Sequence, residues 1–157
     1  MAEINGWLDT KTFHSVVAST PLISIDLLVE NEHGEFLLGL RINRPAQGYW
    51  FVPGGRVQKN ETMDAAFKRL TRIELGLELE RSAAQFIGVY EHFYSDSVFG
   101  STPGTHYIVL AYHVKINACD VQLSADQHTE CRWFDAKQII ADAKVHQYSQ
   151  AYIKDFI

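Results

Sequence analysis

Apolar residues in this chain occur mostly in short runs or in alternation with polar residues, separated by turn-forming residues. This pattern is typical of β-strands. The turn Asn31-Glu-His-Gly34 and the Ser-, Gly- and Pro-rich stretch 95–104 interrupt the pattern and are expected to be a hairpin turn and a loop. We predict strands over residues 22–30, 35–41, 49–52, 85–94, 105–116 and 130–134.

A helical spacing of apolar residues appears between these strands. It predicts a central helix from about Glu61 to Leu75, with Asn60 as the N-cap and Gly76 as the stop. Shorter helices are predicted at 10–18, where Asp9 or Thr10 would cap the first turn, at 136–143 and at 147–156. Strands therefore dominate, and the expected fold class is α/β or α+β, with helices packed on a mixed sheet in a single domain over residues 1–157.

One carboxylate interrupts the apolar face of the central helix. At about 100° per residue, Glu74 lies close to a stripe of apolar side chains on the helical wheel. A buried carboxylate costs several kcal/mol unless it is paired or bound to a cation. A salt bridge, an extended side chain at the helix end and a metal ligand are all compatible with this position. The stripe consists of Met63, Phe67, Leu70, Ile73 and Leu77.

Composition narrows the class of protein. The 157 residues carry a formal net charge of −5, which argues against a nucleic-acid or membrane-surface binder because both need a basic surface. Cys119 and Cys131 form no CxxC pair, and the N-terminus shows no basic region followed by an apolar run. We therefore expect a reduced, cytoplasmic protein.

Residues 55–77 carry the most specific pattern. Gly55 is followed after five residues by Glu61, then after seven by Arg69, and then by Glu74-x-Gly76-Leu77. This spacing, with Trp50-Phe-Val-Pro-Gly-Gly55 before it, resembles the box of the Nudix hydrolase superfamily. The resemblance implies a Nudix fold, in which a mixed sheet is sandwiched between helices and a loop–helix–loop grips a metal-bound diphosphate. Glycines permit close backbone approach to phosphate and metal.

The box departs from the usual family pattern, Arg-Glu-hydrophobic-x-Glu-Glu. The corresponding residues are Arg69-Leu70-Thr-Arg-Ile73-Glu74, so two expected glutamates are apolar. In ordinary members those carboxylates help to bind further metal ions and activate water. The departure therefore implies one metal ion and no base on the helix, or else an inactive domain used for binding.

This altered box resembles that of the GDP-mannose mannosyl hydrolases. The resemblance covers roughly residues 7–135. It includes the segments 19–26, 43–58, 92–94, 105–107 and 126–128. It implies hydrolysis of GDP-mannose to GDP and free mannose, by attack of water at the anomeric carbon with inversion.

The resemblance also implies roles for individual residues. Gly54 (through its carbonyl), Glu74 and Gln127 would bind one Mg²⁺, although Mn²⁺ would suit the same oxygen ligands. His128 would be the general base, since the pKa of histidine lies near neutral pH. From composition alone His128 would be a surface histidine in a polar loop.

The remaining candidates would contact the substrate. Arg41, Arg56 and Arg69 would neutralise the leaving diphosphate, but Arg69 could equally pair with Glu61 and only brace the loop. Asp26 and His92 would contact the sugar or the forming cation, and Tyr107 would contact the leaving phosphate. The nucleotide would be held by residues of the N-terminal segment: Trp7, Leu8 and Phe13. Asp26 would otherwise belong to a polar strand face open to water.

Three functions remain open at this point. The first is a GDP-sugar hydrolase, the second an ordinary Nudix diphosphatase that cuts a P–O bond, and the third an inactive sugar-nucleotide-binding module. The expected partners are GDP-mannose or a related GDP-sugar and a second copy in a homodimer, with neither nucleic acid nor membrane. The sequence leaves open which sugar is bound and what the loop 95–104 does.

Overall fold

The fold is organised around one central strand. The computed structural model describes residues 6–123 and 130–156. Within these residues seven strands form one mixed sheet, in the order β3-β2-β1-β6-β5, with β4 paired to β1 and β7 to β2. The strands are β1 (Leu22–Glu30), β2 (Phe36–Leu40), β3 (Trp50–Phe51), β4 (Gly54–Arg56), β5 (Gln85–Tyr94), β6 (Thr105–Lys115) and β7 (Cys131–Phe134).

One edge of β1 is shared between two partners. β1 pairs along its whole length with the parallel strand β6, but on its other edge it meets β2 only at Glu30 and Phe36. Residues 24–26 on that same edge pair with β4 instead. Because β2 and β4 separate from each other along β1, the sheet opens there.

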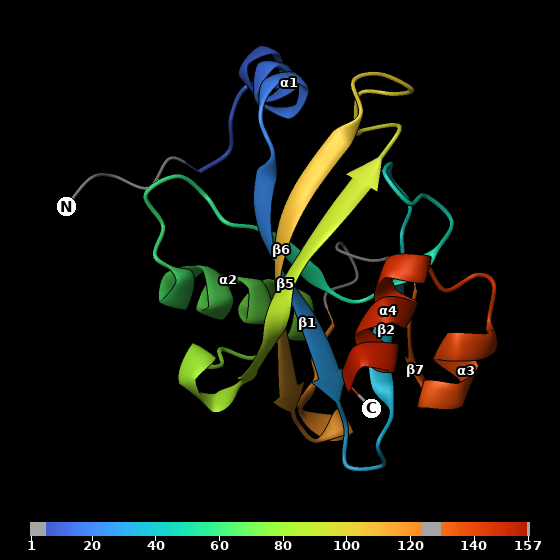
Figure 1. Ribbon diagram of the computed structural model, residues 1–157. Coiled ribbons are helices and arrows are strands. Elements are labelled where there is room, and N and C mark those ends of the chain that lie inside the picture. Colours follow the sequence, from blue (N-terminus) through green and yellow to red (C-terminus); the bar gives the residue numbers. More distant parts are fainter. Residues whose placement is uncertain (1–5, 124–129, 157) are drawn as a thin grey trace.

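Helices cover both faces of the sheet. The helix α2 (Met63–Leu75) lies on one side, and α3 (Ala136–Ala141) and α4 (Gln147–Phe156) lie on the other (Figure 1). The helix α1 (Thr10–Ser19) precedes β1, and the 3₁₀ turns η1 (Arg81–Ala83) and η2 (Ala118–Asp120) are connectors. The expectation of a mixed sheet sandwiched between helices is confirmed.

The sandwich explains the burial of both faces of β1. Ile25, Leu27 and Val29 pack with α2 in one core, whereas Leu28 packs with α4 in the other. Asp26 lies on the α4 side and is only 7% exposed. The alternative of a polar strand face open to water is therefore wrong, because α4 covers that face.

Two local expectations need correction. The central helix begins at Met63, with the Thr62 hydroxyl accepting from Ala65 N, so Asn60 is not its cap. Gly54–Arg56 form a strand although the glycines indicated a loop, because pairing with β1 overrides local propensity. The expected stop at Gly76 is confirmed, since its φ of 71° is left-handed.

Gly76 also lies against Gln122, close to the end of the described segment 6–123. The Gln122 N–H donates to the Leu75 carbonyl at 2.8 Å, and a Cβ on Gly76 would lie 2.3 Å from the Gln122 carbonyl oxygen. The absence of a side chain at Gly76 is thus required twice, by its backbone conformation and by this contact.

We therefore expect Gly76→Ala to cost about 3 kcal/mol in the free energy of unfolding measured in urea. Gly48→Ala is the matched control, because Gly48 has a φ of 84° but a Cβ at this position would meet no atom within 4 Å. That control should lose only the conformational term, about 1 kcal/mol. Equal losses in the two variants would show that the Gln122 contact does not matter.

Candidate active site

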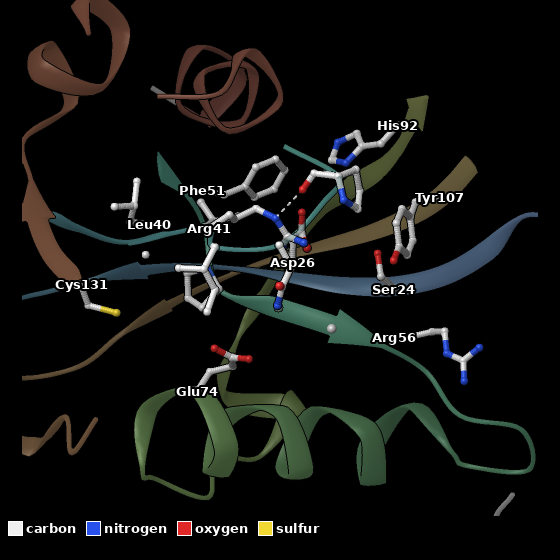
Figure 2. A pocket seen from close by; sticks show the side chains of 18 of the residues that line it. Ser24, Asp26, Leu40, Arg41, Phe51, Arg56, Glu74, His92, Tyr107 and Cys131 are labelled. Carbon is white, nitrogen blue, oxygen red and sulfur yellow. Dashed lines mark hydrogen bonds between the residues drawn. The ribbon is translucent and has the colours of Figure 1, made fainter. Parts of the chain in front are cut away.

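A cleft of about 240 Å³ opens where β2 and β4 separate. It is lined by residues of all seven strands and of α2, so segments distant in sequence meet around it (Figure 2). Seven of the candidate residues line this cleft: Asp26, Arg41, Gly54, Arg56, Glu74, His92 and Tyr107.

The backbone of β4 presents carbonyl groups along the edge that faces α2. Leu27 N donates to Pro53 O, and Val57 N donates to Ile23 O, which fixes the hydrogen-bonded positions of this antiparallel pair. Gly54 and Arg56 occupy the alternate positions, so pairing with β1 does not use their carbonyls. The Arg56 carbonyl accepts from Arg69 on α2 at 2.8 Å, and the Gly54 carbonyl, two residues earlier, points the same way.

Glu74 supplies the carboxylate of the box at this cleft. Its side chain points from α2 toward β4 (Figure 2). Leu70, where the usual pattern has glutamate, is 3% exposed and packs in the core against Gly55, where a Cβ would lie 2.5 Å from Leu70 Cδ2. Ile73 is half-buried. The oxygen atoms of Gly54 and Glu74 are candidate ligands for a metal at this cleft.

Arg69 is engaged elsewhere. Its Nε and Nη2 donate to the Glu61 carboxylate at 2.7 and 2.9 Å, and Nη2 also donates to the Arg56 carbonyl. It is not among the residues that line the cleft. The geometry therefore favours the alternative in which Arg69 braces the loop, over direct contact with a diphosphate.

Arg41 and Arg56 supply the positive charge of the cleft. Arg41 Nε donates to the Pro45 carbonyl at 2.7 Å, which holds the guanidinium in the cleft (Figure 2). Arg56 Cζ lies 4.8 Å from the centre of the Phe13 ring, a cation–π contact from α1. Phe13 thus reaches the site through Arg56.

The other two N-terminal candidates lie outside the cleft lining. Trp7 is 97% exposed and Leu8 is half-buried. Phe13 also contacts Phe99, with ring centres 5.7 Å apart, so the loop 95–104 is attached to α1 beside Arg56. A nucleotide contact from Trp7 or Leu8 has no support in this arrangement.

Burial shifts the titration of the groups deepest in the cleft. It raises the pKa of Asp26 to about 7, against the opposing effects of the Tyr152 hydrogen bond and Arg41. It lowers the pKa of His92 to about 4, with a further contribution from His146, so His92 is neutral at pH 7. Burial also raises the pKa of Tyr107, although Arg41 and Arg56 oppose this.

Gln127 and His128 lie outside the described residues. On one side of them, Gln122 N donates to the Leu75 carbonyl at the end of α2. On the other side, Cys131 lines the cleft. Their roles as metal ligand and general base therefore stay predictions.

Several cleft residues were missed from the sequence. Tyr94 follows His92 by two positions on β5 and shares its face, so strand periodicity could have identified it. Ser24 likewise precedes Asp26 by two positions. Cys131 carries no comparable signal. Tyr152 does not line the cleft but contacts Asp26 across 126 positions of sequence, which no local pattern could indicate.

Comparison with known proteins agrees with the motif at residues 55–77, with its place beside the cleft and with the sheet packed between helices. The family model described as NUDIX domain matches residues 20–156. The chain belongs to the Nudix family. This membership assigns it to the Nudix hydrolases, whose members typically use divalent metal ions.

Relatives of this Nudix hydrolase are found among proteins and structures. It is 35% identical over 141 residues to "Low-salt glycan biosynthesis protein Agl8" of Haloferax volcanii, covering 90% of this chain and 85% of that protein. The MutT protein from Methanosarcina mazei Go1 is 25% identical, with a TM-score of 0.71 and 88% and 94% of the two chains covered. The MutT NUDIX hydrolase from Burkholderia pseudomallei has the same TM-score at 22% identity, with 88% and 100% covered.

No helix within residues 6–123 or 130–156 of this Nudix domain has the length and apolar character needed to cross a membrane. The same ranges hold no group of three or more His, Cys, Asp or Glu side chains placed to bind a metal ion.

The Arg69–Glu61 pair makes stability depend on pH. Burial raises the pKa of Glu61, but the hydrogen bonds from Arg69 and from Gln58 N, with the attraction of Arg69, leave it below the usual 4.5. A lowered folded-state pKa stabilises the fold above pH 4.5, and this contribution is lost as the pH falls through the folded value. We expect Glu61→Gln to cost about 2 kcal/mol at pH 7, with a smaller difference from wild type below pH 4.

Urea unfolding at several pH values measures this difference. Glu78→Gln is the control, because Glu78 pairs with Arg72 of α2 but both side chains are more than half exposed. That substitution should change stability by less than about 0.5 kcal/mol. A pH-independent loss for Glu61→Gln would contradict the linkage.

Proposed function

We propose that this Nudix protein hydrolyses a GDP-sugar, with GDP-mannose as the first candidate, to GDP and the free sugar. Water attacks the anomeric carbon with inversion. The observation that carries the proposal is the burial of Leu70 beneath Gly55, which leaves Glu74 as the box carboxylate at the cleft. A helix without its usual additional carboxylates is poorly equipped to bind several metal ions or to activate water for attack at phosphorus.

The donor set fits one hard cation. The Gly54 carbonyl, unused by strand pairing, and Glu74 line the same cleft. Together with Gln127 they would hold one Mg²⁺, and Mn²⁺ suits the same oxygen ligands. When bound, the ion neutralises charge on the diphosphate and so assists its departure.

The arginines of the cleft favour departure of GDP. Arg41 is fixed by Pro45, and Arg56 is supported by Phe13. Tyr107 lines the same cavity and would donate to a phosphate oxygen. Fixed positive charges at a developing anion stabilise the transition state. Because GDP is already a weak base, its departure needs little proton donation.

The other half of the reaction takes place at the sugar. Asp26 and His92 line the cleft and are both within hydrogen-bonding distance of the Tyr152 hydroxyl, with Asp26 7% exposed and His92 3% exposed. A carboxylate there would stabilise positive charge on the anomeric centre. The base that removes a proton from water is assigned to His128, which precedes the cleft residue Cys131 by three positions.

The similarity to "Low-salt glycan biosynthesis protein Agl8" supports a role with sugar nucleotides. Glycan synthesis draws on activated sugars. A hydrolase in such a setting would remove the activated sugar from use. This similarity is compatible with mannose and with other sugars.

The expected homodimer has a candidate surface. β5 lies at the edge of the sheet, and three large apolar side chains on it are each at least half exposed. A second copy would cover them. They are Phe86, Val89 and Phe93.

The two other functions make different products. A diphosphatase would release GMP and mannose phosphate, and an inactive module would bind GDP-mannose without turnover. Chromatography of the products formed with Mg²⁺, repeated with other GDP-sugars, separates all three cases.

The role of His128 is tested by His128→Ala. We expect the turnover number with GDP-mannose to fall by about 10²–10⁴-fold, since the base is lost, while KM changes by less than about threefold. His33→Ala serves as control, because His33 is exposed in the turn after β1. Unchanged turnover in His128→Ala would remove this residue as the base.

The metal assignment is tested by Glu74→Gln, which keeps the shape of the side chain but removes its charge. The variant should need at least about tenfold more Mg²⁺ for half-maximal activity. Glu78→Gln, just beyond the end of α2 and exposed, should leave the Mg²⁺ titration unchanged. An unaltered requirement in Glu74→Gln would show that Glu74 is not a ligand.

A further inference from the structure

A side chain from the C-terminal helix joins two buried residues that line the cleft. The Tyr152 hydroxyl donates to Asp26 Oδ2 at 2.6 Å, and its oxygen lies 3.2 Å from His92 Nε2. Tyr152 itself is completely buried and does not line the cleft. Strands β1 and β5 and helix α4 are thus connected through one hydroxyl group.

With Asp26 ionised, its carboxylate can only accept, and counting donors then fixes the direction of this chain. A tyrosine hydroxyl has one proton, and here that proton is given to Asp26. The oxygen can then only accept from His92, so His92 Nε2 must carry a proton. A neutral histidine with its proton on Nε2 keeps Nδ1 as a hydrogen-bond acceptor.

The surroundings leave the His92 ring little freedom to change this arrangement. It stacks on Tyr148 with ring centres 4.1 Å apart and planes 2° from parallel. Phe51 and Tyr94 flank it at centre distances of 6.0 and 6.3 Å. The burial that keeps His92 neutral also excludes water as a substitute partner for Nε2.

A buried tyrosine needs a partner for its hydroxyl, so one hydrogen bond alone would be ordinary. What distinguishes Tyr152 is that both of its partners line the cleft while it stands behind them. We propose that Tyr152 is a positioning residue of the active site, which orients the Asp26 carboxylate and holds His92 as the Nε2–H tautomer. His92 therefore presents an acceptor, suited to a sugar hydroxyl. This last role rests on the proposed function, whereas the hydrogen-bond chain does not.

Tyr152→Phe removes the hydroxyl and keeps the ring. Tyr90→Phe is a matched control: Tyr90 packs against Tyr152 with ring centres 4.7 Å apart, but its hydroxyl bonds Asp155 at the surface. Long-range ¹H–¹⁵N correlation spectra, recorded above pH 7 where Asp26 is ionised, report which nitrogen of His92 carries the proton. Wild type and Tyr90→Phe should show the Nε2–H form, and Tyr152→Phe should populate the Nδ1–H form.

Kinetics give a second readout. With GDP-mannose, we expect kcat to fall by about 10- to 100-fold in Tyr152→Phe, the range for a lost hydrogen bond to a charged group, with KM within about threefold. Tyr90→Phe should leave both unchanged. A kcat for Tyr152→Phe equal to that of the control, or a tautomer unaffected by the substitution, would overturn the proposal.

The tautomer measurement and the kinetic measurement can fail independently of each other. If no GDP-sugar is hydrolysed, the proposed function fails, but a tautomer change confined to Tyr152→Phe still supports the role of Tyr152 in ordering His92. If Tyr152→Phe does not fold, the wild-type spectrum decides, because a His92 proton found on Nδ1 contradicts the hydrogen-bond chain.

Discussion

The close approach of two consecutive glycines to their neighbours is the constraint on which the site depends. Gly54 lies opposite Asp26 on β1, where a Cβ would fall 2.5 Å from the Asp26 carboxylate, and Gly55 lies on Leu70 of α2. No larger residue fits at either position without displacing backbone or core. These contacts bring strand, loop and helix together, so that the Gly54 carbonyl, which pairing with β1 does not use, and the Glu74 carboxylate line one cleft.

The same packing gives the domain its chemical character. Leu70 fills the space beneath Gly55 and belongs to the core, so this position presents no carboxylate to the cleft. The same cleft holds the positive charges of Arg41 and Arg56 and the buried side chains of Asp26 and His92. In the proposed reaction, the arginines would stabilise the departing diphosphate, and Asp26 and His92 would act at the sugar.

Much of this arrangement could be predicted from the chain. The mixed sheet between helices and the central helix that ends at Gly76 follow from local patterns, and the structure confirms both. The strand at Gly54–Arg56 could not be predicted, because it exists only through pairing with β1. The sequence could not decide whether Arg69 pairs with Glu61 or contacts a phosphate, because both are ordinary partners of an arginine. It could not link Tyr152 to Asp26 either, because that contact depends on packing between segments far apart in sequence.

The most direct test of the central claim is the position of bond cleavage in GDP-mannose. Hydrolysis with Mg²⁺ in ¹⁸O-labelled water, followed by mass spectrometry, shows which product receives the oxygen of water. Attack at the anomeric carbon places the label in free mannose and leaves GDP unlabelled, which is the expected result. Label in GDP, GMP or mannose phosphate would mean attack at phosphorus, and would contradict the proposal that burial of Leu70 has redirected the chemistry to the sugar.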